Sequence, residues 1–428
     1  MTKDFDLLRS LPRTLLQLAR YYWRKLYVRV ALMGLLAFVA LGFTQMIEVM
    51  VPDKMAQSVP GASADRLLNI IANAMLAVTT FSLTVMVSVY RSSSSQWTPR
   101  VHQLIMQDSV TQNTLAAFIG AYVFALLAII LRETGIYVDD RALVLFWVTV
   151  LVLAYVVWSI IRWVLHLQTL GSLIHTTRQV EDITCTQFRE RLETPCLGAK
   201  AWDGTVPDSA TPIRAKQSGY VQHIYPEALQ EQAEKAGVTL YLSSGIGSFV
   251  FLHEPVVWVD GEVEDRDAFE EEVRSLTVLG DVRTYDQDPR FGLLVMSEIG
   301  SKALSPGVND PGTAIDVLNR SARILSLYKD ETASDADPQY DRLRVRPIDP
   351  FDLIMDAYSG IARDGAGEVE VQQRLQRCLA GLMEHPDEGL QKAAGELGRE
   401  FLDRALEAIT WAPDRDRLLS KTAQRLRD

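Results

Sequence analysis

Cysteine and histidine are scarce in this sequence. Its 428 residues include three cysteines and six histidines, and neither set has a spacing typical of a metal site. An odd number of scattered cysteines also argues against a disulfide framework and fits reduced thiols inside the cell. No nucleophile is paired with a base, and no phosphate-binding loop occurs. The sequence therefore predicts no metal, no cofactor and no catalytic residues, and we do not expect an enzyme.

Positive charge is scarce in the larger part of the chain. Residues 1–165 contain 14 of the 43 Lys and Arg and 9 of the 54 Asp and Glu, which leaves 29 and 45 for the remainder. The net charge is thus +5 in the first part and −16 in the second. Because no basic surface is present to neutralise phosphates, this balance argues against a nucleic-acid partner.

Long apolar runs are concentrated in the first part. A helix crosses the hydrocarbon core of a bilayer with about 20 apolar residues. Four runs reach this length, at about residues 28–51, 67–90, 114–131 and 142–167. The first is too long for the core of a cleaved signal peptide and lacks a small-residue cleavage pattern, so a retained anchor is preferred. The sequence predicts a four-helix transmembrane domain over residues 28–166.

Lysine and arginine predict the direction in which these helices cross the membrane. Seven of them lie before or just inside the first run: Lys3, Arg9, Arg13, Arg20, Arg24, Lys25 and Arg29. We therefore expect this side to be cytoplasmic, and four spans return the chain to it. Both termini and the acidic part would then lie in the cytoplasm. Residues 1–27 are also amphipathic, which favours a helix on the inner leaflet over a plain cap on the first span.

The second span is unusually polar, as the stretch "TTFSLTVMVSVYRSSSSQWTPR" (79–100) shows. At 100° per residue, several polar side chains share one face of a helix. These are Asn69, Asn73, Thr80, Thr84 and Ser88, followed by Arg91 at the inner end. They either form a helix–helix interface, as small hydroxyl residues often do, or line a water-filled path. The serines before Pro99 are expected to form a turn.

The acidic part begins with a β-rich segment. After a connecting helix and linker at 167–204, alternating and β-branched residues predict strands near 213–224, 238–242 and 248–259. A short helix is expected from Pro226 to Lys235. These elements predict a small β-barrel or β-sandwich.

Helical patterns dominate the rest of the acidic part. The β-rich domain is assigned to residues 205–264 and a mainly helical domain to residues 265–428. The expected fold class is an α+β membrane protein, with four transmembrane helices followed by a cytoplasmic small β-barrel or sandwich and an α-helical domain.

Two polar loops in the helical domain could hold a ligand. They are "DVRTYDQDPRFG" (281–292) and "SKALSPGVNDPGTA" (301–314). The ligand candidates are Asp286, Asp288, Arg290, Asn309, Asp310 and Thr313. Free amides at helix starts bind anions, but Asp followed by Pro is also a strong helix-start signal, which recurs at Asp349. Helix capping is the favoured interpretation.

Three stretches resemble a known family. The sequence "SSQWTPR" (94–100), after a serine-rich span, resembles a hallmark of bacterial predicted membrane proteins with domain of unknown function 2254. "DQDPRFGLLVMSEIGSKALSPGVNDPGTAIDVLNR" (286–320) is similar to a second hallmark of that family and "SGYVQ" (218–222) to a third. Trp97 and the insertion "RSSS" depart from its more apolar pattern. The activity of the family is unassigned, so the resemblance implies a location, the inner membrane of a bacterium, and an architecture, but no active residues.

Two functions from different classes fit these features. The first is a homo-oligomeric channel or transporter, in which the second span lines the path and the cytoplasmic domain gates it. The alternative is a membrane-anchored sensor or scaffold, whose acidic cytoplasmic domain binds a small ligand or a protein. In either case the lipid bilayer is a partner.

Overall fold

The chain forms two compact units, Met1–His175 and Thr176–Asp428. The structure is a computed structural model that describes residues 26–50, 60–106, 108–134, 142–169, 171–333 and 337–427. All but the last two residues of the predicted amphipathic segment 1–27 lie outside the described residues. Each unit is considered by itself below.

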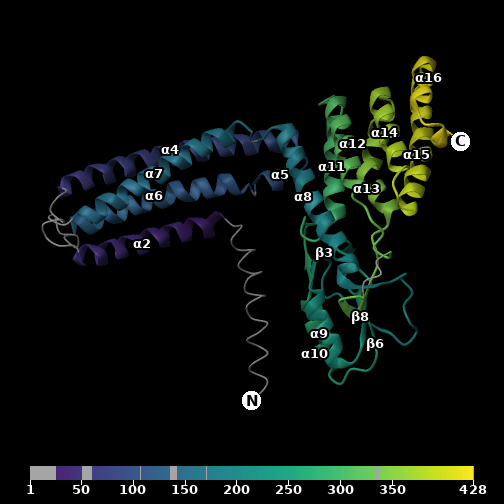
Figure 1. The fold of residues 1–428 in the computed structure, drawn as a ribbon, viewed down its shortest axis with the longest axis horizontal. Coiled ribbons are helices and arrows are strands. Elements are labelled where there is room, and N and C mark those ends of the chain that lie inside the picture. The colour runs from purple at the N-terminus through teal and green to yellow at the C-terminus, as the bar shows by residue number, and fades with distance from the viewer. Residues whose placement is uncertain are drawn as a thin grey trace. The chain divides into compact units, whose positions relative to one another are not determined.

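Four long helices lie side by side in the first unit (Figure 1). They are α2 (Leu26–Met50), α4 (Gly61–Gln96), α6 (Ser109–Glu133) and α7 (Leu143–Leu167). All four are long and apolar enough to cross a membrane, as predicted. α6 is the central helix, because its contacts with α2 and α4 are the most extensive in the unit and it also packs against α7.

Charged groups of the first unit are paired near the helix ends. Arg132, in the last turn of α6, forms an ion pair with Asp65 of α4. At the other end of α6, Asp108 is the N-cap and accepts a hydrogen bond from the backbone N–H of Thr111 at 2.7 Å. The same carboxylate lies 2.8 Å from Nε2 of His166 in α7. These links join α6 to α4 and α7 where charge is least costly in a bilayer.

α4 is longer than predicted. Its 36 residues correspond to about 54 Å at 1.5 Å per residue. The serines at 92–95, expected to form a turn, are helical instead. Ser93 shows why, since its hydroxyl donates to the carbonyl of Tyr90 at 2.9 Å and thus stays bonded within the helix. The break comes at Trp97, which is extended, and Pro99 then begins α5 (Pro99–Met106).

The strands of the second unit form two open sheets. The five-stranded sheet has the order β1 (Ala199–Ala201), β8 (Tyr340–Val345), β4 (Thr239–Leu242), β6 (Pro255–Asp260), β2 (Thr211–Arg214). The three-stranded sheet has the order β5 (Phe249–Val250), β3 (Gly219–Ile224), β7 (Thr277–Gly280). β8 pairs in parallel with β1 and β4, and the other pairs are antiparallel. The predicted barrel or sandwich is not confirmed, because the described strands do not close on themselves.

Strands also occur in the segment that was predicted to be mainly helical. β2 to β6 fall close to the predicted strands, and α9 (Pro226–Ala236) matches the predicted short helix. β7 and β8, however, come from the segment assigned to the mainly helical domain. Leu343 and Val345 of β8 are buried in the sheet core, whereas Arg344 between them is half-buried and Arg342 is exposed. Pairing with strands on both sides stabilises β8 despite its charged sequence.

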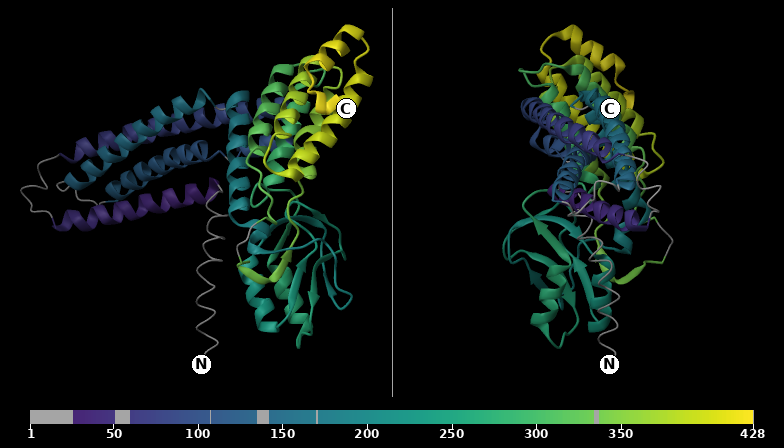
Figure 2. Two further views of the ribbon diagram at one scale, coloured as in Figure 1. Left: turned by 45° about the vertical axis from the view of Figure 1, so that its right-hand side comes forward. Right: turned by 90° about the vertical axis from the view of Figure 1, so that its left-hand side faces the viewer.

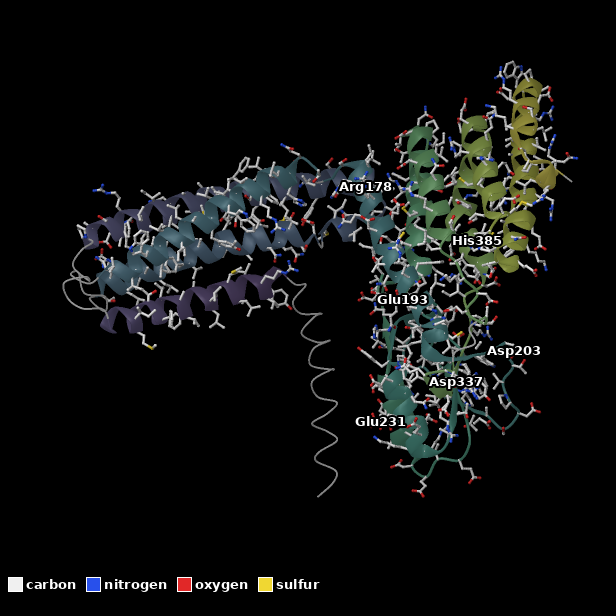
Figure 3. The ribbon with its side chains drawn as sticks, in the orientation of Figure 1. Arg178, Glu193, Asp203, Glu231, Asp337 and His385 are labelled. Carbon is white, nitrogen blue, oxygen red and sulfur yellow. The ribbon has the colours of Figure 1, made fainter. Side chains whose placement is uncertain are left out.

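Helices make up the rest of the second unit. They are α8 (Leu173–Glu193), which begins in the first unit, the short 3₁₀ helix η1 (Pro195–Gly198), α10 (Arg266–Ser275), α11 (Pro289–Ala303), α12 (Pro311–Leu325), α13 (Pro350–Asp364), α14 (Val369–Leu382), α15 (Glu388–Ala408), α16 (Ala412–Lys421) and α17 (Gln424–Arg427). The strands gather at one end of the unit and helices α11 to α16 at the other (Figure 2). In Figure 3, Asp203 and Glu231 mark the strand-rich end and His385 the helical end.

Candidate functional sites

The polar face of α4 points away from the other helices of its unit. Residues on the opposite face are buried: Ala64, Leu68, Ile71, Met75 and Ser82. The predicted polar residues are all exposed: Asn69, Asn73, Thr80, Thr84, Ser88 and Arg91. At 100° per residue the two sets lie on roughly opposite sides of the helix. No other described helix of the first unit covers this face.

Among the described residues, four of these side chains are hydrogen-bonded only to their own helix. Each donates to the backbone carbonyl four residues earlier, at 2.9 Å. The four donors are Asn69, Asn73, Thr80 and Thr84. Within the part of the chain that the structure describes, the side-chain oxygens of the two asparagines accept no hydrogen bond. These oxygens remain available to water or to another chain.

The polar face is as long as a membrane is thick. From Asn69 to Ser88 the helix rises about 28 Å, close to the hydrocarbon thickness of about 30 Å. Arg66 and Arg91 are exposed on the same face beyond the two ends. Apolar side chains flank the face, with Leu76 exposed on one side and Phe81 on the other.

The ligand candidates Asp288 and Asp310 are helix caps. Asp288 begins α11 and accepts from the backbone N–H of Phe291 at 3.0 Å, while Arg283 binds the same carboxylate at 2.7 and 3.1 Å. Asp310 begins α12 and accepts from the hydroxyl and the backbone N–H of Thr313 at 2.5 and 3.0 Å. These hydrogen bonds lower the pKa of Asp310. The capping prediction is confirmed.

The two candidate loops lie at opposite ends of α11. Asp288 precedes the helix, whereas the backbone N–H of Asp310 donates to the carbonyl of Ala303, its last residue, at 2.8 Å. The 15 residues of α11 separate the loops by about 22 Å. Asp286 and Asn309 are exposed, one in each loop. The six residues are therefore not brought into one site, and ligand binding at either loop stays a prediction.

Arg290 is held by two carboxylates of α13. Its Nε lies 2.6 Å from Oδ2 of Asp356 and its Nη1 lies 2.5 Å from Oδ2 of Asp352. Burial lowers the pKa of Arg290, but the two carboxylates more than offset this and raise it. Arg290 thus joins α11 to α13, and its charge is already neutralised.

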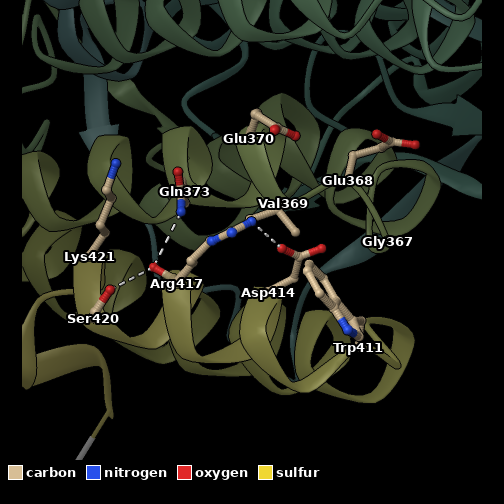
Figure 4. A pocket seen from close by; sticks show the side chains of 10 residues that line it. All are labelled: Gly367, Glu368, Val369, Glu370, Gln373, Trp411, Asp414, Arg417, Ser420 and Lys421. Carbon is tan, nitrogen blue, oxygen red and sulfur yellow. Dashed lines mark hydrogen bonds and ion pairs between the residues drawn. The ribbon is translucent and has the colours of Figure 1, made fainter.

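The sequence did not point to a cleft of about 380 Å³ beside α14 and α16 (Figure 4). Trp411, which is exposed, lies at its edge. The guanidinium of Arg417 is 5.6 Å from the centroid of the Trp411 ring and donates to Asp414 at 2.8 Å. Trp411 could have indicated this site from the sequence, because an exposed tryptophan in a charged helical segment often contacts a partner.

A family model described as "Predicted membrane protein (DUF2254)" matches residues 23–381. The chain belongs to this family. It is similar to the uncharacterized proteins Mb1321c of Mycobacterium bovis and Rv1290c of Mycobacterium tuberculosis, each 26% identical over 302 residues. The match covers 66% of this chain and 55% of each relative, so the chain spans about half the length of these proteins. No solved structure matches.

The titratable side chains of this DUF2254 protein form no metal cluster in the described ranges. Its three cysteines are free, as predicted. Burial raises the pKa of Cys196 to about 12 and that of Cys378 to about 11, and it also raises the pKa of Cys185. Thiols with such pKa values react slowly at neutral pH.

Proposed function

We propose that copies of this chain assemble in the bacterial inner membrane around the polar face of α4, and that this face lines a path for ions or small polar solutes. The single observation behind the proposal is that the face is exposed, opposite a face buried against the rest of the first unit. An amide or hydroxyl facing lipid loses its hydrogen bonds to water. A water-filled path between subunits restores them.

The length of the polar face supports a path rather than a local contact. Polar side chains recur from Asn69 to Ser88, over about 28 Å, so water could follow them through the hydrocarbon. Arg91 is exposed, and in the proposed orientation it lies at the inner end of the path, where a positive charge favours anions. In this proposal both termini lie in the cytoplasm, and the second unit regulates the path.

A cysteine scan of residues 69–88 in sealed vesicles tests this proposal. Asn73→Cys, Thr80→Cys and Thr84→Cys should react with a membrane-impermeant thiol reagent. Phe81→Cys is the matched control, because Phe81 is exposed on the apolar flank of the same helix and would face lipid. The native cysteines are replaced by serine, although their raised pKa values already make them slow to react.

Protection at all scanned positions would contradict a water-filled path. If Asn73→Cys is protected and forms a disulfide between chains, the polar face is instead a dry interface between subunits. Conductance provides a second measurement. Thr84→Val removes a hydroxyl while keeping the side-chain shape, and should change the current across reconstituted bilayers, whereas Ser82→Ala on the buried face should not.

The cleft at Trp411 favours a second function, a membrane-anchored sensor whose second unit binds a ligand. Its lining combines an exposed tryptophan ring with charged side chains, which offer a ligand an aromatic surface and polar partners. Expressing residues 166–428 alone distinguishes the two functions. If this fragment folds, binds a partner and restores function without the spans, the sensor is correct and the path is not needed.

A further inference from the structure

Apolar side chains are exposed on the three-stranded sheet of the second unit. Phe251 is 65% exposed, Leu252 49% and Phe249 44%. Tyr220 lies beside them, with 5.0 Å between the ring centroids of Tyr220 and Phe249 and 5.1 Å between those of Phe249 and Phe251. We call these four residues the aromatic patch. Neighbouring aromatic and aliphatic side chains exposed in this way mark an interaction surface.

The exposure of the aromatic patch follows from the strand pattern. Successive side chains of a strand point to opposite faces of its sheet. Val250 is only 1% exposed and belongs to the core of the second unit. Phe249, its neighbour in β5, therefore points outward, and the exposed ring of Phe251, just after the strand, lies beside that of Phe249. The apolar side chain of Val250 already fills the buried face of this strand, so the outward rings are not needed for the core.

The turn that carries the aromatic patch is held in place. The backbone N–H of Phe251 donates to the carboxylate of Glu254 at 2.8 Å, and the N–H of Leu252 donates to the hydroxyl of Ser218 at 2.9 Å. His253 has a φ of 70°, a left-handed conformation that is unfavourable for residues other than glycine. The turn thus maintains a strained shape that presents Phe251 and Leu252 outward. Such a preorganised surface loses little entropy on binding.

We infer that the aromatic patch binds the lipid bilayer, with Phe251 and Leu252 entering the boundary between headgroups and acyl chains. Phenylalanine and leucine are typical of elements that lie in this boundary, and the hydroxyl of Tyr220 suits the headgroup level. The chain belongs to a family of membrane proteins. Only five residues separate the end of α7 at Leu167 from the start of α8 at Leu173.

This short connection favours lipid over a soluble protein as the partner. The second unit is covalently joined to a helix that is apolar enough to cross the membrane, so the bilayer is always present at a high effective concentration. A few apolar side chains that would bind a free vesicle weakly then suffice. The inference is independent of the proposed path along α4, because it concerns only the second unit.

Depth-dependent quenching in the full-length protein tests the inference. Phe251→Cys, in a Cys185→Ser background, is labelled with an environment-sensitive fluorophore and reconstituted into vesicles containing a shallow nitroxide lipid. We expect a blue shift relative to detergent and quenching by about twofold, as for a group in the interface. Ala408→Cys, exposed at the end of α15, is the matched control and should show neither effect.

Two results would overturn the inference. One is equal emission and equal quenching for the labels at 251 and 408. The other is a label at 251 whose emission stays blue-shifted in detergent, shows energy transfer between labels, and is not quenched by the nitroxide lipid. This result would assign the aromatic patch to contacts between copies of the chain. Adding Leu252→Ser beside the label provides an independent check. It should reduce the quenching while the Cys196 thiol stays protected, and unchanged quenching would also contradict lipid binding.

Discussion

The two units of the chain bury polar groups in different ways. In the second unit, charges lie inside the fold and are paired. The carboxylate of Glu331 is fully buried, binds Arg191, and accepts backbone hydrogen bonds from Cys196 at 3.0 Å and Ile348 at 2.7 Å. Four N–H donors, two from Arg191 and two from the backbone, compensate for the removal of this carboxylate from water.

In the first unit, the ion pairs described above are near the helix ends, and the middle of the helices carries hydroxyl and amide groups. Thr149 shows the usual solution, since its buried hydroxyl donates to the carbonyl of Leu145 at 2.7 Å. The outer face of α4 has the same kinds of groups but no protein cover from its own described helices. The packing of the described helices of the first unit therefore does not account for this polar face.

The largest effect is expected from Glu331→Ala. It leaves the buried Arg191 without its carboxylate and two backbone N–H groups without an acceptor, and should lower the free energy of unfolding of the second unit by about 3–5 kcal/mol. Denaturation can be followed by the reactivity of the buried Cys196 thiol. Glu331→Gln keeps an acceptor oxygen and should lower the free energy of unfolding by less. If the alanine variant loses less than about 1 kcal/mol, the Arg191–Glu331 pair contributes little to the stability of the second unit.

A smaller effect is expected in the first unit from Arg132→Ala. It breaks the ion pair with Asp65 and should lower the stability of the detergent-solubilised protein by about 2 kcal/mol. Thermal unfolding monitored by size exclusion measures the change. Arg66→Ala is the control, because Arg66 lies next to Asp65 but is exposed and should have almost no effect. Similar losses of stability for the two variants would mean that positive charge near α4, rather than the Arg132–Asp65 pair, stabilises the first unit.

Removal of the Asp310 cap should cost less again. Asp310→Ala is expected to destabilise the second unit by about 1 kcal/mol. Because the pKa of Asp310 is lowered in the folded state by Thr313, its contribution is present above the unfolded pKa of about 3.9. The contribution is lost as the pH falls through the folded pKa. Asp310→Asn keeps a capping side chain that does not titrate, so its stability should fall less steeply in acid, and parallel pH profiles would contradict this.

The smallest effect is expected on the exposed face of α4. Asn73→Leu and Thr84→Val should change the stability of the first unit by less than about 0.5 kcal/mol, because neither side chain packs against the described helices. On the buried face of the same helix, Ser82→Leu should destabilise by about 1–3 kcal/mol through overpacking. Equal losses on the two faces, measured by thermal unfolding in detergent, would remove the contrast between them.

Local signals predicted the helices and caps well. The four spans follow from runs of apolar residues, and Asp349 begins α13 as its Asp–Pro pair indicated, with a hydrogen bond from the backbone N–H of Phe351 at 2.9 Å. Contacts between distant segments were not predictable in this way. Glu331 and Arg191 are 140 residues apart, and β8 becomes a strand only through its pairing with β1 and β4.

The polar face of α4 shows a second limit of sequence patterns. Helical periodicity correctly places Asn73 and Thr84 on one face, because every residue advances the helix by 100°. It does not indicate which neighbours cover that face. The answer depends on how α4 rotates against α6 and α7, which its apolar residues such as Leu68 and Met75 decide.

The place of β8 in the sheet has a consequence for biosynthesis. β8 lies between β1 and β4, yet the last of the other strands in that sheet ends at Asp260 and β8 ends at Val345. Ribosomes need roughly ten seconds to translate the stretch between them. During that interval the nascent chain exposes two strand edges that template aggregation. We therefore expect chaperones to bind the nascent chain late in translation, after its spans have entered the membrane.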